Sequence, residues 1–170
     1  MRLVCIALLS TVLPRVANSQ EHDDSTYRGG TSLVAGLGAG QITNRYGALK
    51  AWSGHLGVGV NINETVARLE YFRVAGKTAL SPTRLSHSFL GLVVERWPGD
   101  RLLFAVGLGA SSLSRGDRQQ VRWGASLAMG GVPYWINEQI GLTTQFRILV
   151  GRHNETLHVT GAALVGVALR

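Results

Sequence analysis

Residues 139–150 restrict the possible folds most strongly, because large apolar residues and small or polar residues alternate along almost the whole segment. Successive side chains of a β-strand point to opposite faces, so a period of two predicts a strand with one apolar face and one polar face. The apolar positions are Ile140, Leu142, Phe146, Ile148 and Val150, and the positions between them include Gln139, Gly141, Thr143, Gln145 and Arg147.

Seven further segments repeat this alternation, which predicts eight strands in all. We expect a bulge near Gly130, Gly131 and Pro133, where the alternation changes phase. Three connections, at 61–64, 98–100 and 137–138, are short, whereas we expect longer loops at 44–53, 76–83, 114–120 and 152–156. Short turns at one end and longer loops at the other indicate an up-and-down barrel. The expected strands are residues 31–43, 54–63, 65–75, 85–97, 102–113, 121–136, 139–150 and 158–169.

Composition indicates which face of these strands points outward. A water-facing strand surface would be rich in lysine, glutamate and aspartate, but only 16% of the residues are charged and 22 are glycine. Eight strands enclose an interior that side chains alone can fill. We therefore predict an all-β, eight-stranded antiparallel up-and-down transmembrane β-barrel over residues 31–170, with lipid against its apolar face. The alternative is a secreted soluble barrel that binds a small apolar ligand. Such a barrel shows the same alternation, but its apolar face points inward and its polar face points towards water.

The N-terminal region has the pattern of an export signal. Arg2 precedes an apolar run at residues 3–13, which is too short to cross a bilayer as a helix. We expect residues 1–19 to be a signal peptide cleaved before Gln20, and residues 20–30 to be a flexible lead-in. The single cysteine, Cys5, lies in this signal, which excludes disulfides and cysteine-based sites from the mature chain.

The chain is basic, with 17 lysines and arginines against 10 acidic residues and a pI of about 10.5. Its arginines are scattered singly and do not form a basic patch with interleaved aromatic residues, so we expect no nucleic-acid partner and favour anionic lipid headgroups. Aromatic residues close to the expected strand ends predict two belts at the membrane interfaces. These interfacial aromatic residues are Trp52, Trp97, Trp123, Tyr134 and Trp135.

Two groups of inward-facing polar residues are candidate sites. Arg68, Glu70 and Glu95 lie on neighbouring expected strands, and because buried charges are usually paired, we expect one charge cluster that fills the lumen and fixes the strand register. The second group, nearer the expected longer loops, contains no acid, so it predicts a positive mouth that meets a phosphate or carboxylate, or simply arginines solvated at the rim. It consists of His55, Arg122, Arg147 and His158. We predict no metal site and no cofactor.

The strand layout of residues 31–170 resembles that of the small eight-stranded outer-membrane proteins of Gram-negative bacteria, the surface-antigen and porin-like family. The resemblance implies insertion by the barrel assembly machinery, contact with outer-membrane lipids including lipopolysaccharide, and a structural, surface-interaction or narrow-pore role without catalysis. The chain departs from this family at its end, where Leu169-Arg170 replaces the usual terminal aromatic residue.

The layout is also similar to that of the lipid A deacylases, which use a serine and a histidine two residues apart near the end of the penultimate strand. Residues 145–150 contain neither residue type, and His87 and Ser88 are adjacent and would point to opposite faces. The sequence therefore predicts a protein that is not an enzyme, with a lipid A-modifying barrel enzyme as the alternative.

Overall fold

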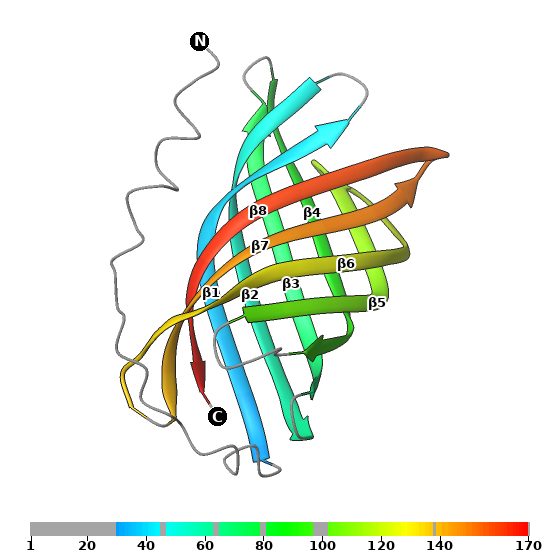
Figure 1. The fold of residues 1–170 in the computed structure, drawn as a ribbon. Helices are drawn as coiled ribbons and strands as arrows, with labels where there is room; N and C mark the ends of the chain where they lie inside the picture. Colours follow the sequence, from blue (N-terminus) through cyan, green and yellow to red (C-terminus); the bar gives the residue numbers. More distant parts are fainter. Residues whose placement is uncertain are drawn as a thin grey trace.

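The computed structural model describes residues 30–44, 47–62, 65–78, 81–96, 102–137 and 139–169. Eight antiparallel strands follow one another around a closed barrel, and the last strand pairs with the first (Figure 1). The predicted fold class is confirmed. The strands are β1 (Gly30–Asn44), β2 (Gly47–Ile62), β3 (Thr65–Thr78), β4 (Ser81–Arg96), β5 (Leu102–Arg115), β6 (Arg118–Trp135), β7 (Ile140–His153) and β8 (Thr156–Leu169).

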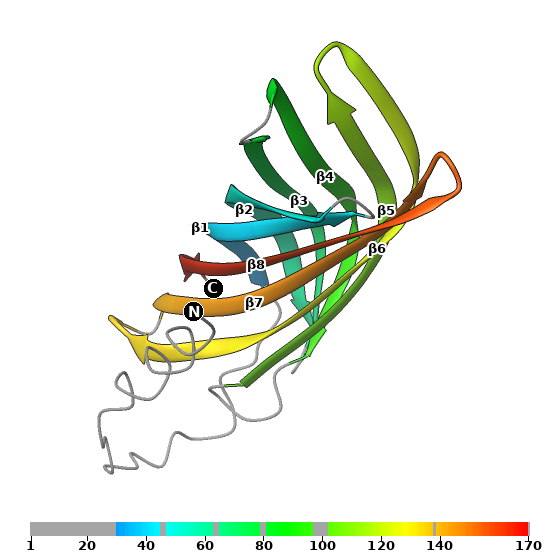
Figure 2. The same ribbon diagram turned by 90° about the horizontal axis from the view of Figure 1, so that it is seen from above.

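Both views show tilted strands that coil around a common interior (Figures 1 and 2). The expected signal peptide and almost all of the expected lead-in lie outside the described residues. Within the described part of the chain, no helix is long and apolar enough to cross a membrane.

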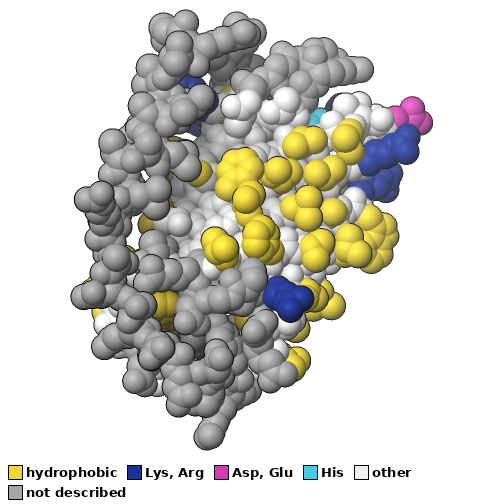
Figure 3. Space-filling model, in the orientation of Figure 1, with side chains coloured by type: hydrophobic (Ala, Val, Ile, Leu, Met, Phe, Trp, Pro, Cys, Tyr) yellow, Lys and Arg dark blue, Asp and Glu magenta, His cyan; other side chains and the backbone are white. Residues whose placement is uncertain are grey.

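The direction of the alternation agrees with the prediction. On β7, Leu142 and Phe146 are 39% and 48% exposed, whereas Gln145 and Arg147, the two residues adjacent to Phe146 in the sequence, are buried. The same pattern places the large apolar side chains of the other strands on the outer wall, where they spread over a wide surface (Figure 3). Soluble monomers rarely expose apolar patches of more than a few hundred Å², so this wall suits lipid better than water.

The lumen is filled and is not lined by small and polar residues alone. Phe72, Phe89 and Leu149 are fully buried and form part of an apolar cluster inside the barrel. Glycines allow the strands to pack closely around this cluster. A Cβ atom at Gly38, for example, would overlap the backbone carbonyl of Ala163 on β8, so the residue at this position must lack a side chain.

The predicted difference in loop length between the two ends is wrong. β2 begins at Gly47 and β4 at Ser81, so most of the expected loops 44–53 and 76–83 belong to strands. The β7–β8 turn contains only Asn154 and Glu155, both with positive φ (46° and 61°), as a two-residue type I′ hairpin requires. Polar residues on strand extensions beyond the apolar wall explain the error, because they have loop-like composition but still pair with neighbouring strands.

Four two-residue connections lie at one end of the barrel, which we call the hairpin end: 45–46, 79–80, 116–117 and 154–155. The opposite end, which we call the terminal end, carries the first residue of β1, the last residue of β8 and the connections 63–64, 97–101 and 136–139. The predicted bulge is confirmed, because the β6–β7 register shifts between Gly131 and Tyr134.

Candidate functional site

A buried ionic network crosses the lumen from β2 and β3 to β7. Arg147 donates from Nη1 to the carboxylate of Glu70 and, at 3.3 Å, to Ser126 Oγ, and from Nη2 to Gln145 Oε1 at 3.2 Å. Nε2 of His55 lies 2.9 Å from Oε2 of Glu70, which is a close contact rather than a well-aligned hydrogen bond. These contacts join strands on opposite sides of the barrel, so they close the lumen at this level.

A second ion pair lies beside this network. Arg68 donates from Nη1 to Glu95 Oε2 at 2.9 Å and from Nη2 to Oε1 at 3.2 Å, the two-pronged geometry in which a guanidinium matches a carboxylate best. Arg147 also lies over the Phe72 ring, with its Cζ atom 5.7 Å from the ring centroid. The two arginines and two glutamates balance one another, so the interior carries little net charge.

The structure thus places Arg68, Glu70 and Glu95 in the lumen, but in two separate pairs. His55 and Arg147 do not lie at a mouth, because they are 3% and 0% exposed and contact Glu70. Alternation along a strand identifies the face of each residue correctly, but it does not give the height of that residue relative to a strand on the opposite side of the barrel. One signal was available in the sequence: the two inward acids have two inward arginines, Arg68 and Arg147, to balance them.

A second polar cluster lies nearer the hairpin end and was missed by sequence reasoning. His87 Nδ1 lies 2.7 Å from Thr160 Oγ1, His87 Nε2 lies 2.8 Å from Ser111 Oγ, and Ser111 Oγ lies 3.1 Å from His153 Nε2. The His153 ring also makes edge contacts with the rings of His87 and His158, with centroids 5.4 and 5.8 Å apart. The inward positions of three histidines near one end could have indicated this cluster.

The hydroxyl of Ser111 has one proton, so it can donate to one histidine and must accept from the other. A serine beside a histidine that a third group orients resembles an activated nucleophile. Ser111, however, is completely buried, and a Cβ added at Gly124 would lie only 2.5 Å from its Cβ. In this packing the hydroxyl is enclosed and connects His87 to His153.

His153 is the last residue of β7, beside the two-residue turn at the hairpin end, whereas His158 lies within β8 between the outward-facing Leu157 and Val159. Burial lowers the pKa of His153, and the nearby charges of His158 and Arg122 lower it further. The His153 imidazole is therefore neutral at pH 7. The described residues contain no group of three or more histidine, cysteine or acidic side chains arranged to hold a metal ion.

The positive mouth is built differently from the prediction. Arg122 is exposed and His158 is half-buried, whereas Arg115 and Arg118, which were not predicted, face each other directly across the β5–β6 hairpin. The acidic residues of the turns, Asp117 and Glu155, lie at the same end. The mouth is thus a mixed rim in which arginines predominate.

The aromatic residues agree only in part with two interfacial belts. Trp52 and Trp123 are 81% and 83% exposed on the outer wall, and Tyr134 is exposed nearer the terminal end. Trp135 departs from the prediction, because it packs against the apolar cluster inside the barrel. The alternation of a strand explains this position, since the preceding residue, Tyr134, faces outward. Trp97 lies outside the described residues.

Several solved structures share this fold. Neisserial surface protein A matches with a TM-score of 0.66 and 16% sequence identity, over 84% of this chain and 98% of that protein. Ail, the attachment invasion locus protein of Yersinia pestis, was crystallised in complex with the heparin analogue sucrose octasulfate. It matches with a TM-score of 0.52 and 9% identity, over 84% of this chain and 99% of that protein. No family model matches the sequence, and no curated protein matches it significantly. These similarities establish the fold of small eight-stranded outer-membrane barrels.

Proposed function

We propose that this chain spans the outer membrane of a Gram-negative bacterium as a sealed barrel and acts at the cell surface, in a structural or interaction role. The lumen network carries this proposal. Glu70 on β3 is bound to Arg147 on β7, and Arg68 is bound to Glu95 beside them, with the apolar cluster packed around both pairs. Side chains that contact one another across the lumen obstruct the path of a solute.

The outer wall supports residence in a membrane. Its apolar side chains face outward on every described strand, and each strand of the closed barrel pairs with two neighbours, as a sheet that crosses hydrocarbon requires. We place the hairpin end on the outside of the cell, because its basic side chains suit an anionic surface. Outer-membrane lipids and the barrel assembly machinery are the partners that this role requires.

Three measurements test this function with the full chain. The expressed protein should fractionate with outer membranes, and its mobility on a gel should shift when the sample is heated. In a planar bilayer it should give no stable conductance steps, whereas a general porin in the same bilayer should conduct. Steps of reproducible size would refute the sealed lumen, and a protein found only in the soluble fraction would refute the membrane barrel.

The alternative of a lipid A-modifying enzyme is tested separately. We expect the lipid A of cells with and without the protein to give the same acyl pattern by mass spectrometry, because the enclosed Ser111 is out of reach of a lipid substrate. Loss of an acyl chain only in cells that contain the protein would contradict this expectation.

A further inference from the structure

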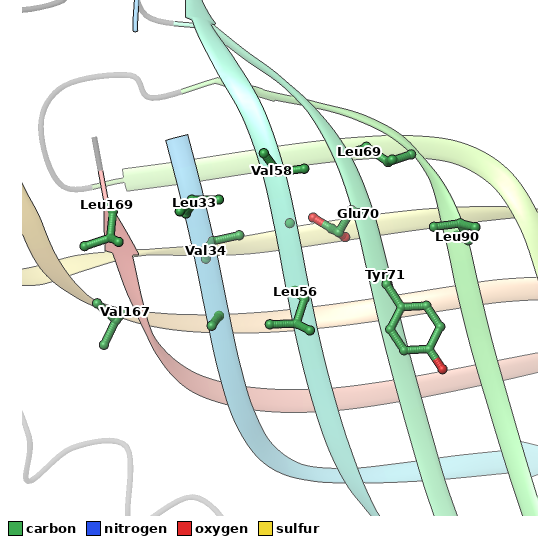
Figure 4. A pocket seen from close by; sticks show the side chains of 12 residues that line it. Leu33, Val34, Leu56, Val58, Leu69, Glu70, Tyr71, Leu90, Val167 and Leu169 are labelled. Carbon is green, nitrogen blue, oxygen red and sulfur yellow. The ribbon is translucent and has the colours of Figure 1, made fainter. Parts of the chain in front are cut away.

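A groove runs along the outer wall over β8, β1, β2 and β3. Its lower part lies towards the terminal end of the barrel, which points up in Figure 4, and has a volume of about 490 Å³. This part is bordered by Leu33, Val58 and Leu69 and reaches Tyr71 (Figure 4). Its upper part, with a volume of about 750 Å³, continues past Trp52 towards the hairpin end. The two parts form one groove, because both are lined by the same four residues, Ala35, Leu56, Tyr71 and Val167.

Small residues help to form this groove. Ala35, Gly54 and Ala75 occupy outward positions along it, between larger side chains such as Leu56 and Trp52. A Cβ atom at Gly54 would meet only the side chain of Leu37, at 3.7 Å, so the space beside it is open. Strand packing does not require glycine at this position, in contrast to Gly38.

The length of the groove matches one membrane leaflet. Six residue steps from Val58 to Trp52 on β2, at about 3.3 Å each, give about 20 Å along the strand. With a strand tilt of about 40°, this corresponds to a depth of about 15 Å, half of the ~30 Å hydrocarbon core. The groove therefore has the dimensions of an acyl chain that ends at the membrane surface.

Three cations stand where the groove meets that surface. Arg73 and Arg84 line its upper part, and Lys77 lies directly opposite Arg84 in the β3–β4 register. Like charges placed opposite each other destabilise a strand pair unless an anion lies between them. Arg73 donates to Ser86 Oγ at 3.3 Å, and among the described residues none of the three cations forms an ion pair. Of the described acids, Glu70 and Glu95 lie in the lumen and Glu155 lies in the β7–β8 turn. Asp117 lies in the turn next to Arg84, where Gly116 N donates to the Arg84 carbonyl at 3.1 Å, but its carboxylate forms no ion pair with Arg84.

We propose that this groove binds a phosphorylated glycolipid of the outer leaflet, with an acyl chain along Ala35 and Gly54 and a phosphate between Lys77 and Arg84, next to Arg73. The apolar floor distinguishes this ligand from a soluble phosphate or polyanion, which would gain nothing from it. Three cations on two strands match a headgroup with more than one phosphate better than a headgroup with a single phosphate. The inference rests on the proposed function for the orientation of the barrel in the membrane.

The test uses the full chain in nanodiscs of zwitterionic phospholipid that contain either bisphosphorylated lipid A or phosphatidylglycerol. After extraction into a neutral detergent, native mass spectrometry counts the lipid that stays bound. We expect the wild type to retain lipid A in preference to phosphatidylglycerol. Removal of one cation, in Arg73→Gln or Arg84→Gln, should lower lipid A retention roughly fivefold, as expected for one basic group at an anionic surface. Gly54→Leu should lower it similarly by filling the groove.

Matched controls lie outside the groove. Arg152→Gln removes an exposed outward arginine on β7, and Ala110→Leu enlarges an exposed outward alanine on β5, so both should retain lipid A as the wild type does. In lipid-free detergent, Arg84→Gln should unfold at the same or a higher urea concentration than the wild type, because it relieves the repulsion with Lys77. A purely structural arginine would instead lose stability.

Either of two results would overturn the inference: equal retention by groove variants and controls, or equal retention of phosphatidylglycerol and lipid A by the wild type. Failure of the proposed function is recognised separately, since the protein would then not insert into the nanodiscs or show a heat-dependent mobility shift.

Discussion

Replacement of Glu70 by glutamine tests the lumen network most directly. The substitution keeps the shape of the side chain but removes the negative charge that Arg147 and His55 contact. Arg147 is 0% exposed and would keep only Ser126 and Gln145 as neutral partners. Removal of one partner from a buried ion pair costs about 3–5 kcal/mol, because the remaining charge is left without compensation. We expect a loss of that size in the free energy of unfolding.

The double variant Glu70→Gln/Arg147→Gln separates this penalty from a simple loss of packing. With both charges removed, neither side chain is a buried unpaired ion, so the double variant should be more stable than either single variant. A double-mutant cycle should then give a coupling energy of about 3 kcal/mol, at the upper end for side chains in contact. Arg152→Gln, at an exposed outward position near the end of β7, is the matched control and should change stability by less than about 0.5 kcal/mol.

The assay is equilibrium unfolding in urea of the protein folded in lipid or detergent, followed by tryptophan fluorescence at pH 7. The heat-dependent mobility shift verifies that each variant is folded at the start. The reasoning is refuted if Glu70→Gln lies within about 1 kcal/mol of the wild type, or if the losses of the two single variants simply add in the double variant.

Two further predictions concern close packing and pH. Gly38→Ala should prevent folding or strongly destabilise the barrel, because its Cβ would overlap the Ala163 carbonyl. Gly54→Ala should leave the urea midpoint of unfolding unchanged, because the space beside Gly54 is open. Equal urea midpoints for the two variants would contradict this prediction. The folded state lowers the pKa of His153 below the ordinary value of 6.5, so the unfolded chain takes up a proton first and stability should fall as the pH drops below about 6.5. The variant His153→Gln should lose less stability than the wild type between pH 7.5 and pH 5, and an equal loss would show that this imidazole does not contribute.

The sequence was sufficient for the strands and their faces because the lipid and the lumen impose opposite requirements on alternate residues. A large apolar residue such as Leu142 and a polar residue such as Arg147 each fit only one side of the wall. The bulge near Gly131 was also predictable, because the same alternation visibly changes phase there.

Strand ends were less predictable, because beyond the membrane both faces of a strand can be polar. Lys50, Arg84 and Arg118 lie in strands although their surroundings have the composition of a loop. Backbone pairing with a neighbouring strand, which the local composition does not report, keeps these residues in the ladder. The expected longer loops were wrong for this reason.

Contacts across the lumen depend on the stagger of all eight strands, which no single segment reports. Arg147 and Glu70 are 77 residues apart, and Ser111 and His153 are 42 apart. The inward direction of each side chain followed from alternation, but its partner depends on the height of each strand around the barrel. The network and the histidine cluster therefore became visible only in the assembled structure.

The distribution of satisfied and unsatisfied charge indicates where a partner can bind. Inside the barrel, the carboxylates of Glu70 and Glu95 each contact an arginine, so their charges are balanced within the fold. On the outer wall, Lys77 and Arg84 face each other above an apolar groove, and neither forms an ion pair with a described acid. An ion pair that is complete within the fold stabilises the fold, whereas a pair of like charges is stabilised only by something that the fold does not supply. The binding chemistry of this barrel is therefore expected on its membrane-facing wall rather than in its lumen.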